Sequence, residues 1–134
     1  MHLRRLGAGP LAGSVTYPSE YIPAMRICAV AVGDYGTGYC IDKPRDAADW
    51  RLPVPPGRWW LWAWPEDGSG VPGRHSQASD CIADGRHGCD DHAMRVLEVG
   101  AGETRGGVQI NDWYADPEDG INPEPPRGEP LPDH

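Results

Sequence analysis

The feature that most constrains this chain is residues 55–64, which read PPGRWWLWAW. They hold four of the six tryptophans of a protein that has no phenylalanine. Two prolines and a glycine favour a turn, and the aromatic residues after them favour a β-strand. Strand side chains alternate between two faces, and each large aromatic buries roughly 150–250 Å², so we expect this strand to contribute most to the core. The expected core side chains are Trp59, Leu61 and Ala63, and the expected outer ones are Trp60, Trp62 and Trp64.

The outer tryptophans need a cover. Three of them in a row would expose an apolar patch of roughly several hundred Å², which is more than a soluble monomer normally tolerates. We expect the connection 65–92, which begins where the strand ends, to fold back over them, with Trp113 and Tyr114 as further candidates. Two alternatives stay open: an open platform for a sugar or a partner protein, and an interface between subunits.

Short alternating runs elsewhere in the chain predict further strands. The 18 glycines and 15 prolines punctuate these runs, and no segment of 10 or more residues shows a helical period. This pattern predicts an all-β sandwich of two sheets with almost no helix. Pro53 suits a strand at a sheet edge. The seven expected strands are 13–17, 25–32, 37–42, 50–54, the tryptophan strand, 93–99 and 104–110.

The chain divides into three parts within one domain. A length of 134 residues fits a single core. We expect a flexible N-terminal segment at 1–12, the sandwich at 13–115, and an acidic, proline-rich tail at 116–134 that is extended or disordered.

Four cysteines in a small β domain predict two disulfides and an oxidising compartment. A hairpin formed by 26–32 and 37–42 would bring Cys28 beside Cys40 across the ladder. Cys81 and Cys89 would then close a short loop and staple the long connection 65–92, which supports an ordered loop there. The expected compartment is periplasmic or extracellular. Residues 1–13 do not resemble a signal peptide, so we expect the export signal to be missing from this chain.

The charge of the chain argues against nucleic-acid binding. The net charge is −8 with a pI near 4.9, and the basic residues form no stripe that could follow a phosphate backbone. The acidity is a feature of solubility. The sequence also contains no apolar run long enough for a transmembrane segment.

Several pieces of the chain, taken in order, resemble a known family. They are GSVTYPSE at 13–20, IPAMR at 22–26, VPPG at 54–57, the Cys81–Cys89 loop, VGAGET at 99–104 and DWYA at 112–115. Over about 13–115 the chain resembles the carboxypeptidase-regulatory-like (transthyretin- or prealbumin-like) β-sandwich domains of secreted bacterial proteins. The resemblance implies a seven-stranded, prealbumin-like or immunoglobulin-like sandwich that is often exported and often attached to other modules, with no catalytic residues. Cys28 and Cys40 depart from the family pattern, so their disulfide rests on strand register alone.

The sequence carries no motif of a hydrolase. It lacks the His-x-x-Glu and His-Glu-x-x-His patterns that hold a catalytic zinc, and it lacks a Gly-x-Ser-x-Gly elbow. His75-Ser76 with a distant aspartate could form a triad only by coincidence, and a polar loop is the simpler interpretation.

The loop 81–92 is the sharpest candidate for chemistry. Its ligand types for zinc are Cys81, His87, Cys89 and His92, and its carboxylates for calcium are Asp80, Asp84, Asp90 and Asp91. The cysteine spacing does not match a zinc knuckle, an oxidising compartment would form the disulfide first, and the aspartates lack the alternation of a calcium loop. We therefore expect a disulfide here and neither metal nor cofactor.

Two function classes remain. The first is a non-catalytic exported module with a structural or protein-interaction role, whose partner is another envelope or secreted protein. The second is a carbohydrate- or other ligand-binding module that uses an aromatic sheet face. The candidate binding residues for it are Trp60, Trp62, Trp64, Trp113 and Tyr114. An enzyme is not expected.

Overall fold

The computed structural model describes residues 9–17, 20–66, 72–113 and 125–131, and about half of the chain is in strands while 5% is helical. The strands in chain order are β1 (Gly9–Val15), β2 (Met25–Ala31), β3 (Asp34–Lys43), β4 (Asp49–Val54), β5 (Gly57–Pro65), β6 (Gly73–Arg74), β7 (Leu97–Val99) and β8 (Arg105–Ile110). One short helix, α1 (Ser79–Ala83), lies between β6 and β7.

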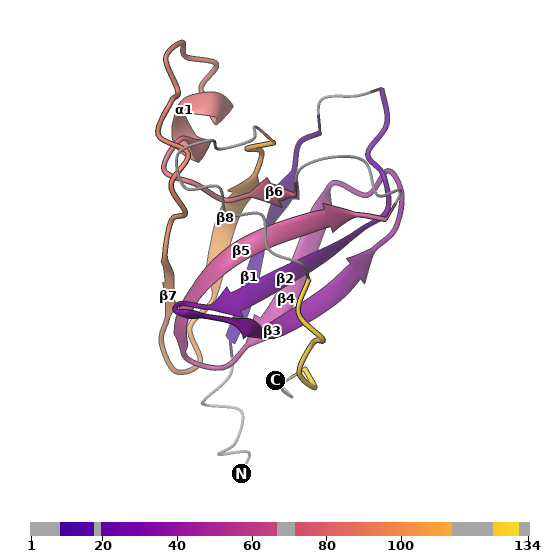
Figure 1. Ribbon diagram of the computed structural model, residues 1–134, viewed down its shortest axis with the longest axis vertical. Coiled ribbons are helices and arrows are strands. Elements are labelled where there is room, and N and C mark those ends of the chain that lie inside the picture. Colours follow the sequence, from indigo (N-terminus) through magenta and orange to yellow (C-terminus); the bar gives the residue numbers. More distant parts are fainter. Residues whose placement is uncertain (1–8, 18–19, 67–71, 114–124, 132–134) are drawn as a thin grey trace.

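The strands form two sheets that pack as a sandwich (Figure 1). One sheet has three strands in the order β4-β1-β8. The other has five, in the order β3-β2-β5-β6 with β7 also paired to β5. The predicted two-sheet β-sandwich is therefore confirmed. The described residues form eight strands where seven were expected, because β6 continues the sheet beyond β5 with only two residues, too few to leave a period in the sequence.

The strand boundaries differ most from the prediction at β1, at β7 and at β3, which begins at Asp34, three residues before the predicted start. β1 begins at Gly9, so residues 9–12 are not part of a flexible N-terminal segment; they pair with β4, from Gly9 opposite Val54 onward. Pro10 faces Pro53 there, and β8 joins β1 only from Leu11, so β1 is an outer strand where it contains proline. The expected strand 93–99 is shorter, because only 97–99 pair with β5.

The core lies between the sheets. Trp59, Leu61 and Ala63 of β5 face it and are exposed by 5%, 0% and 0%, which confirms the predicted inner face of the tryptophan strand. Other members come from every strand except β3 and β6. Tyr39 and Ile41 of β3 are partly buried and pack against this cluster, whereas Arg74 of β6 is fully buried outside it. Pro53 lies on β4, an edge strand as predicted.

Both predicted disulfides are formed. Cys28 lies directly opposite Cys40 in the β2–β3 ladder, with a Cα–Cα distance of 4.1 Å. Cys81 and Cys89 are joined at a Cα–Cα distance of 5.7 Å, and they close the loop that follows α1. None of the four cysteines is free.

Part of the expected tail packs against the sandwich. Residues 125–131 are described, and within them Pro126 is buried and the backbone N–H of Glu129 donates to the carbonyl of Gly38 in β3 at 2.7 Å. In Figure 1 this segment, drawn in yellow, runs beside β3. The expectations for residues 1–8, 116–124 and 132–134 lie outside the described residues.

Candidate functional site

The candidate site is the outer face of the five-stranded sheet, on the side away from the core. Because cross-strand partners share a face, the register places Cys28 of β2, Cys40 of β3, Trp62 of β5 and Arg74 of β6 in one row across it. Trp60 and Trp64 lie on the same face, two residues to either side of Trp62 along β5. We call these residues the outer face.

Trp62 is fully covered. It is exposed by 0% and forms a second apolar cluster with Cys28 and Val30. The guanidinium of Arg74 lies 4.6 Å from the centre of its ring, and Met94 packs against the same cluster. Arg74 belongs to the connection 65–92, so the expected cover is present at Trp62 and is formed by a cation on an aromatic ring.

Trp60 and Trp64 are half-buried at the margins of this cluster. The rings of Trp62 and Trp64 stack with their centres 6.2 Å apart and an angle of 24° between their planes. Trp64 also lies beside Arg26 of β2, which forms an ion pair with Asp42 at 3.1 Å. The outer face is therefore closed at its centre and partly open at Trp60 and Trp64.

Trp113 lies apart from the outer tryptophans. It packs against the main core, edge-on to Tyr17, and its indole N–H donates to the carbonyl of Thr16. A Cβ on Gly73 would come within 2.6 Å of its ring, so a glycine is needed there for the ring to lie against β6. The expected contribution of Trp113 to the outer stripe is wrong in position, and Tyr114 lies outside the described residues.

Arg74 is held in place from the C-terminal end of β8. Its backbone N–H donates to the carbonyl of Asp112 at 2.9 Å, and the N–H of Asp112 donates back at 3.3 Å. One guanidinium nitrogen donates to the carbonyl of His92 at 3.2 Å. Arg74 is exposed by 0%, so these bonds fix a buried cation over the ring of Trp62.

Asp112 is the centre of a buried polar cluster. Its Oδ2 accepts hydrogen bonds from the hydroxyl of Ser76 and from Nδ1 of His92, each at 2.6 Å. Asp112 and Ser76 are exposed by 0%, whereas the side chain of His92 is exposed by 18%. This order differs from a nucleophile–histidine–carboxylate relay, because the carboxylate stands between the hydroxyl and the imidazole. His75, the histidine of the coincidental triad, bonds through Nδ1 to the carbonyl of Gln109 at 2.7 Å.

The same cluster anchors helix α1. The hydroxyl of Ser79 accepts from the N–H of Ser76 at 2.9 Å, and the side-chain amide of Asn111 donates to the carbonyl of Ser79 at 3.0 Å. Both acceptors are buried, and a buried polar group that loses its partner is costly. The residues 74–79 are thereby tied to 111–112, and the disulfide loop starts from a fixed point.

The ligand types of loop 81–92 do not converge. Cys81 and Cys89 are bonded to each other, and His92 bonds to Asp112. Asp80 pairs with Arg95 at 2.9 Å, a bond that holds the pKa of Asp80 below its usual value, and Asp84 pairs with Arg86 at 2.6 Å. Within the described part of the chain, no group of three His, Cys, Asp or Glu side chains is arranged to hold a metal ion.

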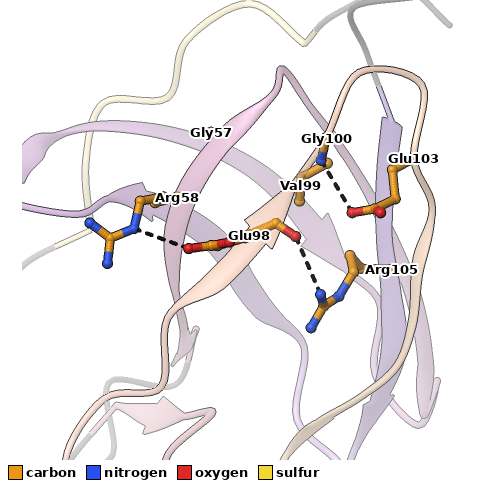
Figure 2. A pocket seen from close by; sticks show the side chains of 7 residues that line it. All are labelled: Gly57, Arg58, Glu98, Val99, Gly100, Glu103 and Arg105. Atoms are coloured by element: carbon orange, nitrogen blue, oxygen red, sulfur yellow. Dashed lines mark hydrogen bonds and ion pairs between the residues drawn. The ribbon is translucent and has the colours of Figure 1, made fainter.

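A charged hollow of about 530 Å³ lies beside β7, at the opposite edge of the sheet from β3 (Figure 2). Nε of Arg58 and Oε1 of Glu98 form an ion pair at 3.6 Å, with side chains exposed by 61% and 74%. Arg105 donates to the carbonyl of Glu98 at 3.4 Å, and the carboxylate of Glu103 accepts from the N–H of Gly100 at 3.2 Å. The hollow thus presents two cations and two carboxylates to solvent.

Comparison with known proteins identifies no relative: no family model, no curated protein and no solved structure matches this chain. Across the described residues, no helix has the length and apolar character that crossing a membrane requires.

The cluster of Arg74, Asp112 and His92 was missed by sequence analysis. Its members stand alone in the sequence, and only the pairing of β6 with the end of β8 brings them together.

Proposed function

We propose that this protein is a non-catalytic β-sandwich module of an oxidising compartment, with a structural or protein-interaction role. The observation that carries the proposal is the inward use of its polar chemistry. Asp112 is fully buried and accepts from Ser76 and His92, and Arg74 is fully buried against Trp62. These groups join a loop to two strands, so their polar atoms hold the fold together and do not face a substrate.

The cysteines support the compartment. Both pairs are oxidised, and disulfides persist mainly in oxidising compartments, which supports a place in the periplasm or outside the cell. The resemblance to carboxypeptidase-regulatory-like domains of secreted bacterial proteins agrees with export and with a place beside other modules.

The charged hollow is the surface on which we place a protein partner. Exposed ion pairs such as Arg58–Glu98 contribute little to folding, roughly 0–1 kcal/mol, so their charges are available for recognition. A partner with complementary charges would gain orientation and association rate from two cations and two carboxylates set side by side.

Photo-crosslinking tests this role. Amine-reactive reagents have little to act on, because Lys43, the one lysine, is buried and bonded through Nζ to the carbonyls of Pro44 and Ala47. A photo-reactive amino acid at Glu98 should trap one defined exported protein in the producing cell. The matched control is the same amino acid at Arg51, an exposed residue of β4. Equal products at both sites, or none at Glu98, would remove the hollow as a contact surface.

Ligand binding by the aromatic face is the second candidate, and the half-exposed rings of Trp60 and Trp64 favour it. Retention on polysaccharide affinity gels tests it. Binding that is lost in Trp60→Ala and Trp64→Ala, with unfolding unchanged, would support a sugar platform over the structural role. Migration equal to that of a non-binding protein on every gel would count against it.

A further inference from the structure

We propose that residues 125–131 occupy a peptide-binding site on β3, and that this site takes a segment of a partner protein with the same proline and glycine pattern in their place. We call residues 125–131 the strap. The site lies on the opposite edge of the sheet from the charged hollow. The proposal goes beyond the role argued above, and it stands or falls by contacts of its own.

The strap sits on β3 as a bound peptide would. Pro126 is buried, and the N–H of Glu129 donates to the carbonyl of Gly38 at 2.7 Å. A Cβ built on Gly128 would lie 3.8 Å from Sγ of Cys40, so the backbone passes close over the disulfide. Residues 125, 127 and 129 are exposed. Residues 126 and 128 therefore lie toward the sheet, and the chain turns at Gly128, whose φ is +90°.

The sheet is shaped to receive the proline ring. A Cβ on Gly38 would lie 2.7 Å from Cγ of Pro126, a distance that side-chain atoms do not adopt. Glycine at this position of β3 leaves the space that the ring fills. β3 is also an edge strand, and edge strands bind extended peptides through main-chain hydrogen bonds, with pockets for alternate side chains that give specificity.

The strap is held by few contacts, which allows exchange. Among the described residues, it makes one backbone hydrogen bond to the rest of the protein, the bond from Glu129 to Gly38. Five of its seven residues are exposed, and Leu131, at 46%, is one of two exposed large hydrophobic side chains in the described part of the chain. Segments with so little buried area open first.

The contacts define the ligand. It is a segment with a proline that fills the space over Gly38, a glycine two residues later that adopts a positive φ, and a free backbone N–H on the residue after that glycine. Proline suits such a site because its fixed φ leaves the segment with less conformational freedom to lose on binding. A partner that offers this pattern competes with the strap for the same edge.

The test uses the full chain with a matched pair of substitutions. Glu129→Pro removes the N–H that bonds to Gly38, whereas Glu129→Ala keeps it and removes only the side chain. A fluorescent peptide with the sequence of residues 125–131 is titrated into both variants and the wild type, and its anisotropy is measured. Gly38 itself is left unchanged, since a Cβ there would also approach the carbonyl of Ala29 at 3.0 Å.

We expect saturable binding to the Glu129→Pro chain that is at least tenfold tighter than to the wild type or to Glu129→Ala, whose own straps compete. A peptide that carries Glu129→Pro should not bind, and one that carries Glu129→Ala should bind like the native sequence. Equal affinity for the three chains, binding of the Glu129→Pro peptide, or a strap that stays docked in the Glu129→Pro chain by amide exchange would each overturn the proposal.

Exclusion chromatography of the wild type separates the remaining occupant. A dimer that grows with concentration, is lost in Glu129→Pro and persists in Glu129→Ala would mean that a second copy of this chain exchanges its strap, and the partner protein would be the wrong choice. A monomer at all concentrations supports it. The crosslinking result at Glu98 is independent of either outcome, because that residue lies on β7.

Discussion

The two faces of β5 bury their aromatic side chains in different ways. On the inner face, Trp59 and Leu61 are covered by a whole second sheet, and the cluster they join has fifteen buried members. On the outer face, Trp62 is exposed by 0% but lies in a cluster with three buried members, covered by Arg74 and Met94. Trp59 and Trp62 are therefore buried to a similar degree, Trp59 by a second sheet and Trp62 by single side chains.

This difference bears on stability and on function. A layer of apolar side chains tolerates change, because neighbours from several strands share the contact. The outer cover consists of Arg74 and Met94, and the position of Arg74 depends in turn on the backbone of Asp112 and the carbonyl of His92. A single substitution can therefore open the outer face, and its neighbours Trp60 and Trp64 are already half-exposed.

The largest effect should come from removing the covered ring. Trp62→Ala should lower the free energy of unfolding by about 3–5 kcal/mol, as for a core aromatic, because it leaves a cavity under Arg74. Trp60→Ala, on the same face but half-buried, is the matched control and should cost clearly less. Urea unfolding followed by circular dichroism measures both. Equal losses would mean that the two positions are covered alike, and the comparison would fail.

Removing the disulfide of the outer face should have the next largest effect. The Cys28→Ala, Cys40→Ala double variant should lose about 3 kcal/mol by loop-closure entropy. The Cys81–Cys89 bond closes a shorter loop, so the Cys81→Ala, Cys89→Ala variant should lose about 2.5 kcal/mol of unfolding free energy by the same loop-closure argument. Protease resistance should follow the opposite order, since the loop after α1 has few ladder bonds to hold it. Faster cleavage of the Cys28, Cys40 variant at 81–89 would contradict this.

The carboxylate beneath the cover should contribute less. Asp112→Asn keeps the shape of the side chain but removes the charge that accepts from both Ser76 and His92, and it should cost about 1–3 kcal/mol. Ser76→Ala, made in the wild type and in the Asp112→Asn variant, completes a double-mutant cycle in urea. Additive losses would show that the hydroxyl of Ser76 and the carboxylate of Asp112 are not coupled, and would contradict the buried polar cluster as a unit.

Sequence analysis predicted the features that follow from the alternation of side chains along a strand and from the register between paired strands. The inward set of β5 follows from period two, the Cys28–Cys40 bond from the hairpin register, and the edge position of β4 from Pro53. It could not predict β6, because two residues have no period, nor the start of β1, because Gly9 and Pro10 are weak strand formers that only the pairing with β4 stabilises.

The outer site was beyond reach for a related reason. Arg74 and Asp112 are 38 residues apart, and each is an ordinary polar residue where it stands. Their contact is set by an isolated bridge between the last residue of β6 and the second residue after β8. The expectation that 65–92 folds back was right at Trp62 because an exposed apolar stripe needs a cover. Which side chain supplies that cover is a matter of tertiary packing.

The smallest effect concerns His75, the residue after Arg74, and it is a dependence of the unfolding free energy on pH. His75 is 5% exposed and donates from Nδ1 to the carbonyl of Gln109 in β8, and burial away from water is the main cause that lowers its pKa from the ordinary 6.5. The hydrogen bond to Gln109 acts in the opposite direction and is outweighed. Because the folded pKa lies below the unfolded one, the unfolded chain takes up the proton first as pH falls, and the folded state loses stability from about pH 6.5 downward until its own pKa is passed. Above pH 6.5 the contribution of the neutral His75 to the stability of the folded state is fully present.

His75→Gln removes the titrating group, so the difference in unfolding free energy between wild type and variant should be level above about pH 6.5 and should shrink or reverse below it. Urea unfolding of both proteins in matched buffers from about pH 5 to 8 measures this difference and cancels every other titrating group. A difference that is level across the whole range would show that His75 is as well solvated in the folded chain as in the unfolded one, and the region between β6 and β8 would then be open to water.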